Sequence, residues 1–305
     1  MFQIISDGGC DFTRSEVLRH KVDIIPFYVT LDQETYLKEG VDISKEEYFM
    51  RLLGDKNLFP KTAQPSPQDY IDAYTQHLAA GKDIISLTIS SKLSGTYNSA
   101  KLAADTLAED YPNRTIIVID SLNCALGQGL ILKEIVKMRD KGFPIHETAR
   151  LAGEVIKSAK IYFSLETLEY LKRGGRVGPT TALVGGILGL CPVLHLVDGE
   201  IQQLDSVRGK ARVFKLMKEG VIAALKDNIH DVNLSVGHIL RLDEATKFNT
   251  ELELALGMDT RNPVVEIGAT IGTHAGPGAL AVAYCKKHEA LMANWASSHN
   301  YKKLA

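Results

Sequence analysis

Short apolar runs rich in β-branched residues alternate with amphipathic patterns through the first half of the chain. The runs lie at residues 2–6, 24–29, 84–89 and 116–119. A loop follows each run, and beyond it apolar residues recur every three or four positions, as they do along one face of a helix. Strands that alternate with helices usually pair in parallel, so this half predicts a mostly parallel sheet flanked by helices.

Local signals place the ends of several helices. Ser66 precedes Pro67, which is typical of an N-cap followed by a first-turn proline, and Gly81 is a C-terminal stop. The helix predicted between them, 67–80, has one apolar stripe made of Tyr70, Ala73, Tyr74, His77 and Leu78. We therefore interpret His77 as a residue on the core side of this helix. Further helices are predicted at 95–109, 125–141 and 146–159.

The second half of the chain has a different order of elements. Apolar β-rich pieces are predicted as strands at 161–164, 192–197, 201–207, 232–237, 264–269 and 279–284. Only two long helical patterns, 210–226 and 243–256, occur among them. This half therefore predicts a mixed or antiparallel sheet with helices. The fold class is α/β with two domains, 1–160 and 161–305, and a cleft between them is the expected ligand site.

Charge and cysteine content exclude several classes of function. The 305 residues include 35 Lys plus Arg against 37 Asp plus Glu, so no strong positive field is present to attract nucleic acid. The four cysteines have no CxxC or Cys/His spacing, which favours reduced thiols over a disulfide framework or a zinc site. We expect no metal and no cofactor.

Two segments bear on membranes and location. The N-terminus has no basic region followed by a long apolar stretch, so no export signal is predicted and a cytoplasmic location is expected. Residues 177–197 contain no charged side chain, which is about the length of a membrane span. Prolines, glycines and His195 interrupt this segment, which favours a buried helix and strand over stable membrane insertion.

A hydroxyl-rich loop joins the buried run 84–89 to the next helix. Ser90, Ser91 and Ser94 precede Gly95 and Thr96. Free amides at a helix N-terminus attract anions, and a glycine allows an acceptor to approach the backbone. These residues indicate an anion site with hydroxyl donors at Ser94 and Thr96. The same serines are equally typical of simple helix caps.

Two further loops contain candidate polar residues. Thr62 lies in the segment 62–67, in which two prolines favour an extended approach to a helix. His274 lies before Gly276-Pro277-Gly278, so we expect it in a rigid turn between two strands. Without other information, a loop threonine is usually only solvated.

The common catalytic signatures are missing. We find no P-loop, GxSxG elbow, HExxH or metal-ligand spacing. Two basic clusters lie next to glycines, one at 171–176 with Arg173 and one at 207–212 with Arg208. Such clusters are usually solvated faces or helix ends.

Six motifs, in order along the chain, resemble the DegV family over essentially its whole length. They are Ser6-Asp7 with Asp11, residues 62–66, residues 90–96 with Ser99-Ala100, Asp120-Ser121, residues 165–176, and residues 274–279. The resemblance implies a two-domain protein that holds a long-chain fatty acid in an apolar tunnel with its carboxylate at the domain interface. By the same resemblance, Thr62 and Ser94 bind the carboxylate and His274 lies nearby.

The resemblance also implies a partner. Bacterial members of the family present the fatty acid to a separate ATP-dependent fatty acid kinase subunit, and Arg208 matches the arginine of the docking surface. Residues 182–196 are a candidate for part of the tail tunnel, with plain core packing as the alternative. Two other functions stay open, a transferase or hydrolase that uses Ser94 with His274, and a docking module in which lipid is only a structural filler.

Overall fold

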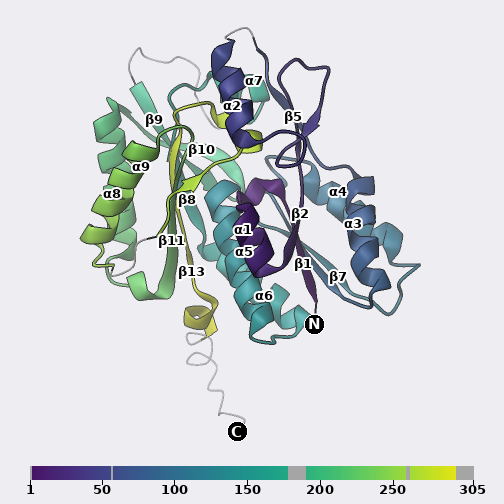
Figure 1. Cartoon of the computed structure of the whole chain (residues 1–305). Helices are drawn as coiled ribbons and strands as arrows, with labels where there is room; N and C mark the ends of the chain where they lie inside the picture. The colour runs from purple at the N-terminus through teal and green to yellow at the C-terminus, as the bar shows by residue number, and fades with distance from the viewer. Residues whose placement is uncertain (1, 56–57, 178–189, 259–261, 293–305) are drawn as a thin grey trace.

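The computed structural model describes residues 2–55, 58–177, 190–258 and 262–292. Its helices and strands form two halves, each built around one main sheet (Figure 1). Both kinds of sheet expected from the sequence are present, so the predicted α/β fold class is confirmed. Within the described part, no helix is long and apolar enough to cross a membrane. Residues 178–189, which make up more than half of the uncharged segment 177–197, lie outside the described residues.

The first sheet is entirely parallel, in the order β2-β1-β6-β7. Its strands are β1 (Gln3–Asp7), β2 (Val22–Ile25), β6 (Ile84–Thr88) and β7 (Ile116–Asp120). All five residues of β6 are buried, as expected for a central strand covered by helices on both faces.

Helices cover both faces of this sheet. On one face lie α3 (Pro67–Ala79) and α4 (Thr96–Leu107) (Figure 1). Helix α3 buries Tyr70, Tyr74 and Leu78 in the core on this face. The Ser66 side chain accepts a hydrogen bond from the Asp69 amide, so the predicted cap of α3 is present. On the other face lie α1 (Arg14–His20), the 3-10 turn η1 (Gly8–Cys10), α5 (Ala125–Asp140) and α6 (Ile145–Ser158).

The sequence did not predict a small third sheet, in the order β4-β3-β5. Its strands are β3 (Tyr28–Thr30), β4 (Leu37–Lys38) and β5 (Lys61–Ala63), and α2 (Lys45–Gly54) lies between the last two along the chain. The predicted strand 24–29 is in fact split between β2 and β3. The break falls at Pro26, because proline has no N–H to donate to a strand ladder.

The second half contains a mixed six-stranded sheet in the order β10-β9-β8-β13-β11-β12. Its strands are β8 (Lys160–Ser164), β9 (Leu190–Val197), β10 (Glu200–Arg208), β11 (Val232–His238), β12 (Val265–Glu266) and β13 (Leu280–Lys286). Every pair is antiparallel except β11 with β12. The outer face is covered by α8 (Lys210–Leu225) and α9 (Leu242–Ala255), on the left of Figure 1.

Residues 264–269 are not the strand that their composition predicts. Only Val265 and Glu266 pair, and the chain then forms helix α10 (Ala269–Ala275). The Asp11 carboxyl accepts a hydrogen bond from the Gly268 amide at 2.9 Å, and the Glu39 carboxylate accepts those of Ala269 and Thr270. These two distant side chains satisfy the free amides at the start of the helix, which a local pattern does not reveal.

Helix α5 is central to the molecule. It packs against both α6 and the inner face of β13, and almost all of its residues are buried (Figure 1). A helix from the first half thus contributes to the core beneath the second sheet. The domain division at 160/161 stays a prediction.

The Asp11 carboxyl predicts a pH dependence of stability. Burial, more than the nearby Glu39, raises its pKa from 3.8 to about 8, and its buried Oδ2 atom has no hydrogen-bond partner among the residues that the structure describes. Because the folded pKa lies above the unfolded one, this group favours folding below about pH 4, and the contribution is lost as the pH rises to about 8. Asp11→Asn keeps an acceptor for the Gly268 amide. Its melting temperature should therefore exceed that of the wild type by a margin that grows between pH 5 and pH 8.

Thermal unfolding followed by circular dichroism across this pH range measures that margin. The exposed Asp110→Asn change is the control and should show no such trend. An Asp11→Asn curve parallel to the wild-type curve at every pH would mean that the carboxyl is already ionised in the folded protein.

Candidate functional site

A narrow, largely apolar cavity lies between the two halves of the molecule. About 760 Å³ of it is not filled by atoms, its open mouth included, but the centre of a water molecule fits in only about 80 Å³. The lining residues come from both halves of the chain: Phe27, Thr62, Ile89, Leu93, Ser94, Cys124, Ala125, Ile161, Phe163, Leu165, Leu171, Arg176, Ile201, Ile267, Thr270, Ile271, His274, Ala275, Ala279 and Ala281. The shape suits a thin aliphatic guest better than a bulky polar one.

Polar groups gather where β5, the loop before α4 and helix α10 meet. The Thr62 hydroxyl lies 2.8 Å from His274 Nε2 in a hydrogen bond that joins residues from opposite ends of the chain. The Ser94 hydroxyl, which lines the same cavity, lies 2.7 Å from the Thr96 hydroxyl. One end of the cavity therefore has uncharged hydrogen-bonding groups.

Helix α10 positions His274. Its residues Thr270, Ile271, His274 and Ala275 form one helical face that lines the cavity. The Tyr48 hydroxyl lies 2.6 Å from the Thr273 hydroxyl and fixes the opposite side of the helix. The predicted Gly-Pro-Gly turn therefore does not hold His274 directly; the imidazole lies on the last turn of a short helix.

Burial and, to a lesser extent, the charge of Arg176 lower the pKa of His274 from 6.5 to about 4. The ring is therefore neutral at pH 7, with a proton on one nitrogen only. Its Nδ1 atom has no partner among the described residues. A neutral imidazole serves here as a hydrogen-bonding group and not as a fixed positive charge.

Gly174 and Arg176 complete this end of the cavity. A Cβ atom at Gly174 would lie 2.1 Å from His274 Nδ1, so only glycine leaves room for the ring. The Arg176 guanidinium donates to the Leu93 carbonyl at 3.1 Å and to the Gly174 carbonyl at 2.5 Å. It thereby joins the loop of Ser94 to the end of α7 (Glu169–Gly174).

The predicted binding residues separate into two groups. Thr62, Ser94 and His274 line the cavity, whereas Gly95 and Thr96 do not. A Cβ at Gly95 would lie 2.5 Å from Gln64 Oε1, so this glycine makes room for a protein side chain. Thr96 is fully buried and contacts Ser94. The roles of these five residues stay a prediction.

The serines of this loop do not act as helix caps. The N-cap of α4 is Gly95, without a side-chain hydrogen bond, and the Ser90 hydroxyl donates to the Gly199 carbonyl at 2.8 Å. Sequence reasoning missed Arg176 and Thr270 as lining residues. Arg176 belonged to a basic cluster whose neighbours are exposed, and Thr270 lay just beyond the predicted strand 264–269.

The predicted docking residues lie outside the cavity. Arg173 on α7 is exposed, and its guanidinium lies 4.7 Å from the centre of the Phe59 ring. Arg208 is exposed at the end of β10. Two residues further on, the Lys210 ammonium lies 2.8 Å from Glu166, just before α7. Both arginines are accessible to a partner.

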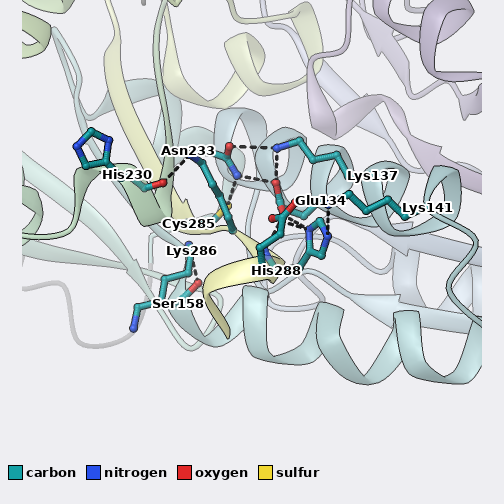
Figure 2. A network of polar contacts seen from close by, with 11 residues as sticks. Glu134, Lys137, Lys141, Ser158, His230, Asn233, Cys285, Lys286 and His288 are labelled. Atoms are coloured by element: carbon teal, nitrogen blue, oxygen red, sulfur yellow. Dashed lines mark hydrogen bonds and ion pairs between the residues drawn. The ribbon is translucent and has the colours of Figure 1, made fainter. Parts of the chain in front are cut away.

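A buried polar network lies elsewhere, where α5 meets the ends of β11 and β13 (Figure 2). Glu134, His288 and Glu289 are, among the described residues, the one group of three such side chains close enough to share a metal ion. The ammonium of Lys137 lies 2.6 Å from Glu134, and that of Lys141 contacts His288 and Glu289. Lysines therefore supply the positive charge in this network, and its residues do not fit a metal site.

A comparison with known protein families agrees with the resemblance seen in the motifs. The model of the DegV family, a family of uncharacterised proteins, matches residues 1–287. The chain belongs to the DegV family. A DegV domain-containing protein of Clostridium perfringens is 31% identical over 288 residues, which are 93% of this chain and 99% of the relative.

Solved DegV structures share the whole fold. A stearic acid-binding protein of Eubacterium ventriosum is 32% identical with a TM-score of 0.89, covering 95% of this chain and 99% of its own. A DegV family protein of Thermus thermophilus, described by its fatty acid binding, is 28% identical with a TM-score of 0.84, covering 93% and 99%. The two-part architecture of this chain therefore agrees with that of the family.

The space beside Gly174 makes a direct prediction about His274. Gly174→Ala should displace the imidazole and break its hydrogen bond to Thr62, because the new methyl group overlaps Nδ1. The ring nitrogen chemical shifts and the titration of His274, measured by NMR, should both change. Gly153→Ala, in α6 with open space around its Cα, is the matched control and should leave both unchanged. Wild-type shifts in Gly174→Ala would contradict the placement of the ring.

Proposed function

We propose that this DegV family protein binds one long-chain fatty acid, with the carboxylate at Thr62, Ser94 and His274 and the tail in the apolar cavity. One observation carries the proposal: uncharged donors from three separate segments converge at one end of a narrow apolar cavity. The fatty acids bound by proteins of the same fold and family support the choice of ligand.

Tail burial supplies most of the binding free energy. A chain of about sixteen carbons at about 0.8 kcal/mol per CH₂ corresponds to on the order of 10 kcal/mol, before the costs of association are subtracted. The walls contribute few competing polar atoms, since most lining residues are aliphatic or aromatic. The head group then determines orientation more than affinity.

The head site can hold an ionised carboxylate without a direct salt bridge. With its proton on Nε2, His274 donates to the Thr62 oxygen, which leaves the Thr62 hydroxyl proton for the ligand. Arg176 adds positive potential, but two of its N–H groups already donate to carbonyls of the protein. Thr270 lines the cavity, and its buried hydroxyl, which has no hydrogen-bond partner in the described part of the chain, is a further available donor.

The same geometry disfavours an enzyme built on Ser94 and His274. The His274 ring is hydrogen-bonded to Thr62, and the Ser94 hydroxyl is hydrogen-bonded to Thr96. The described contacts therefore include no hydrogen bond between Ser94 and His274, which a nucleophile and its general base would need. A histidine whose pKa is about 4 is also a weak general base at pH 7. Turnover of an ester or a phosphate by the isolated chain would restore this alternative.

We further propose that the protein presents its fatty acid to a separate ATP-dependent kinase. A carboxylate that attacks ATP must stay ionised and nucleophilic, and neutral hydroxyls hold it less tightly than a salt bridge does. Exposed Arg173 and Arg208 are the proposed docking residues. If the protein stimulates the kinase equally with and without bound fatty acid, it is instead a docking module in which the lipid is only a structural filler.

Loss of the two hydroxyls tests the head site. Thr62→Val combined with Ser94→Ala should reduce the bound fatty acid at least about tenfold in a wash with competing acceptor vesicles, since each lost bond to a charged group contributes roughly 1.5–3 kcal/mol. Native mass spectrometry measures occupancy, and circular dichroism checks the fold. Thr106→Val with Ser158→Ala, at hydroxyls remote from the cavity, is the control pair. Full retention by the double variant would remove these hydroxyls from the site.

Docking is tested separately from lipid binding. Arg208→Ala should leave the bound fatty acid unchanged and lower the yield of acyl phosphate when a bacterial fatty acid kinase and ATP are added. Lys247→Ala, which removes an exposed cation on α9, should change neither quantity. A wild-type yield from Arg208→Ala would contradict the proposed docking role.

A further inference from the structure

The two faces of strand β13 differ in side-chain size. On the outer face, Leu280, Val282 and Tyr284 pack against helices α8 and α9. On the inner face, Ala281 and Ala283 are both alanine, and Ala279, directly before the strand, continues the same pattern. Because successive residues of a strand point to opposite faces, this alternation leaves free volume on the inner face only.

Strand β8, which pairs with β13, has large residues on the same inner face. Ile161 and Phe163 line the cavity, and so does Leu165, the residue directly after the strand. In the antiparallel register, Phe163 lies beside Ala281, and Ile161 lies beside Ala283. The space left by the alanines is therefore bounded on one side by a row of three large side chains.

The cavity follows these strands away from the polar end. Leu165 and Ala279 lie near α7 and α10, which carry Gly174 and His274. Residues two apart along extended chain are separated by about 6.6 Å, so Ile161 lies roughly 13 Å from Leu165, the residue directly after β8. Ile161 is thus the lining residue of β8 that is furthest from the proposed head site.

Along β13, the cavity lining among the described residues stops at this level. Ala281 lines the cavity, but Ala283, the next inward residue of β13, does not. Cys124 and Ala125, at the start of α5, also line the cavity, and α5 packs against β13. Ile161 is only 2% exposed and stands between the end of the cavity and this packed core.

We propose that Ile161 closes the deep end of the channel and sets the longest acyl chain that the protein accepts. The proposal rests on the fatty-acid function and adds the residue that determines chain length. Ala281 has the complementary role, because its small side chain keeps the channel open beside Phe163, two residues from Ile161. A larger side chain at either position shortens the channel, and truncation of the Ile161 side chain lengthens it.

A competition experiment tests this directly. The wild type, Ile161→Ala and Ala281→Val are offered an equimolar mixture of saturated fatty acids of even chain length, and the bound acid is identified by mass spectrometry. Ile161→Ala should raise the ratio of the next longer acid to the preferred one roughly tenfold, the ratio that burial of two further methylenes supplies. Ala281→Val should shift the preference toward shorter acids.

Leu280→Ala is the matched control, because it removes the same number of carbons from the outer face of the same sheet. It should keep the wild-type chain-length profile. If Ile161→Ala does not fold, Ile161→Val should show a smaller shift in the same direction. Wild-type profiles in all folded variants, with one acid bound per chain, would overturn the role of Ile161 and leave the proposed function standing. No acid bound by any form, the wild type included, would instead overturn the proposed function.

Discussion

The cavity depends on how helix α10 is held. Two acidic side chains from the first half of the chain, Asp11 and Glu39, accept hydrogen bonds from the amides at its start, and Tyr48 bonds Thr273 on its far side. These contacts fix a helix from the second half against the first half without filling the space beneath it with side chains. Polar anchoring at the ends of α10 therefore lets His274 meet Thr62 while the apolar face of α10 stays available to a ligand.

The composition of the six-stranded sheet provides the remaining volume. Close packing is the normal state of a protein interior, so a cavity persists only where the surrounding side chains cannot collapse into it. Alanines on the inner face of β13 leave the space, and the backbone ladder of β8, β13 and β11 keeps the sheet from moving inward. The cavity is thus a consequence of side-chain size on a rigid frame.

The sequence predicted what depends on local pattern, and it missed what depends on distant contacts. The alternation of runs and helices predicted the parallel sheet, and Ser66-Pro67 predicted the start of α3. The run 264–269 was predicted as a strand because no local residue caps the helix that begins there. The amides of its first turn donate instead to Asp11 and Glu39, more than two hundred residues away. Arg176 could not be separated from its exposed neighbours, because only the fold shows which side chain of a basic cluster turns inward.

Ligand binding and folding are coupled in such an architecture. An apolar channel without a guest leaves its walls without packing partners, which lowers the free energy of unfolding. A guest that binds only the folded state raises that free energy in proportion to the logarithm of its free concentration over its dissociation constant. The same residues that leave room for a tail therefore make the stability of the protein depend on the tail. A wall residue that changes the fit of the chain changes affinity and stability together through tail burial, whereas a change confined to the polar end acts through the hydrogen bonds to the head group.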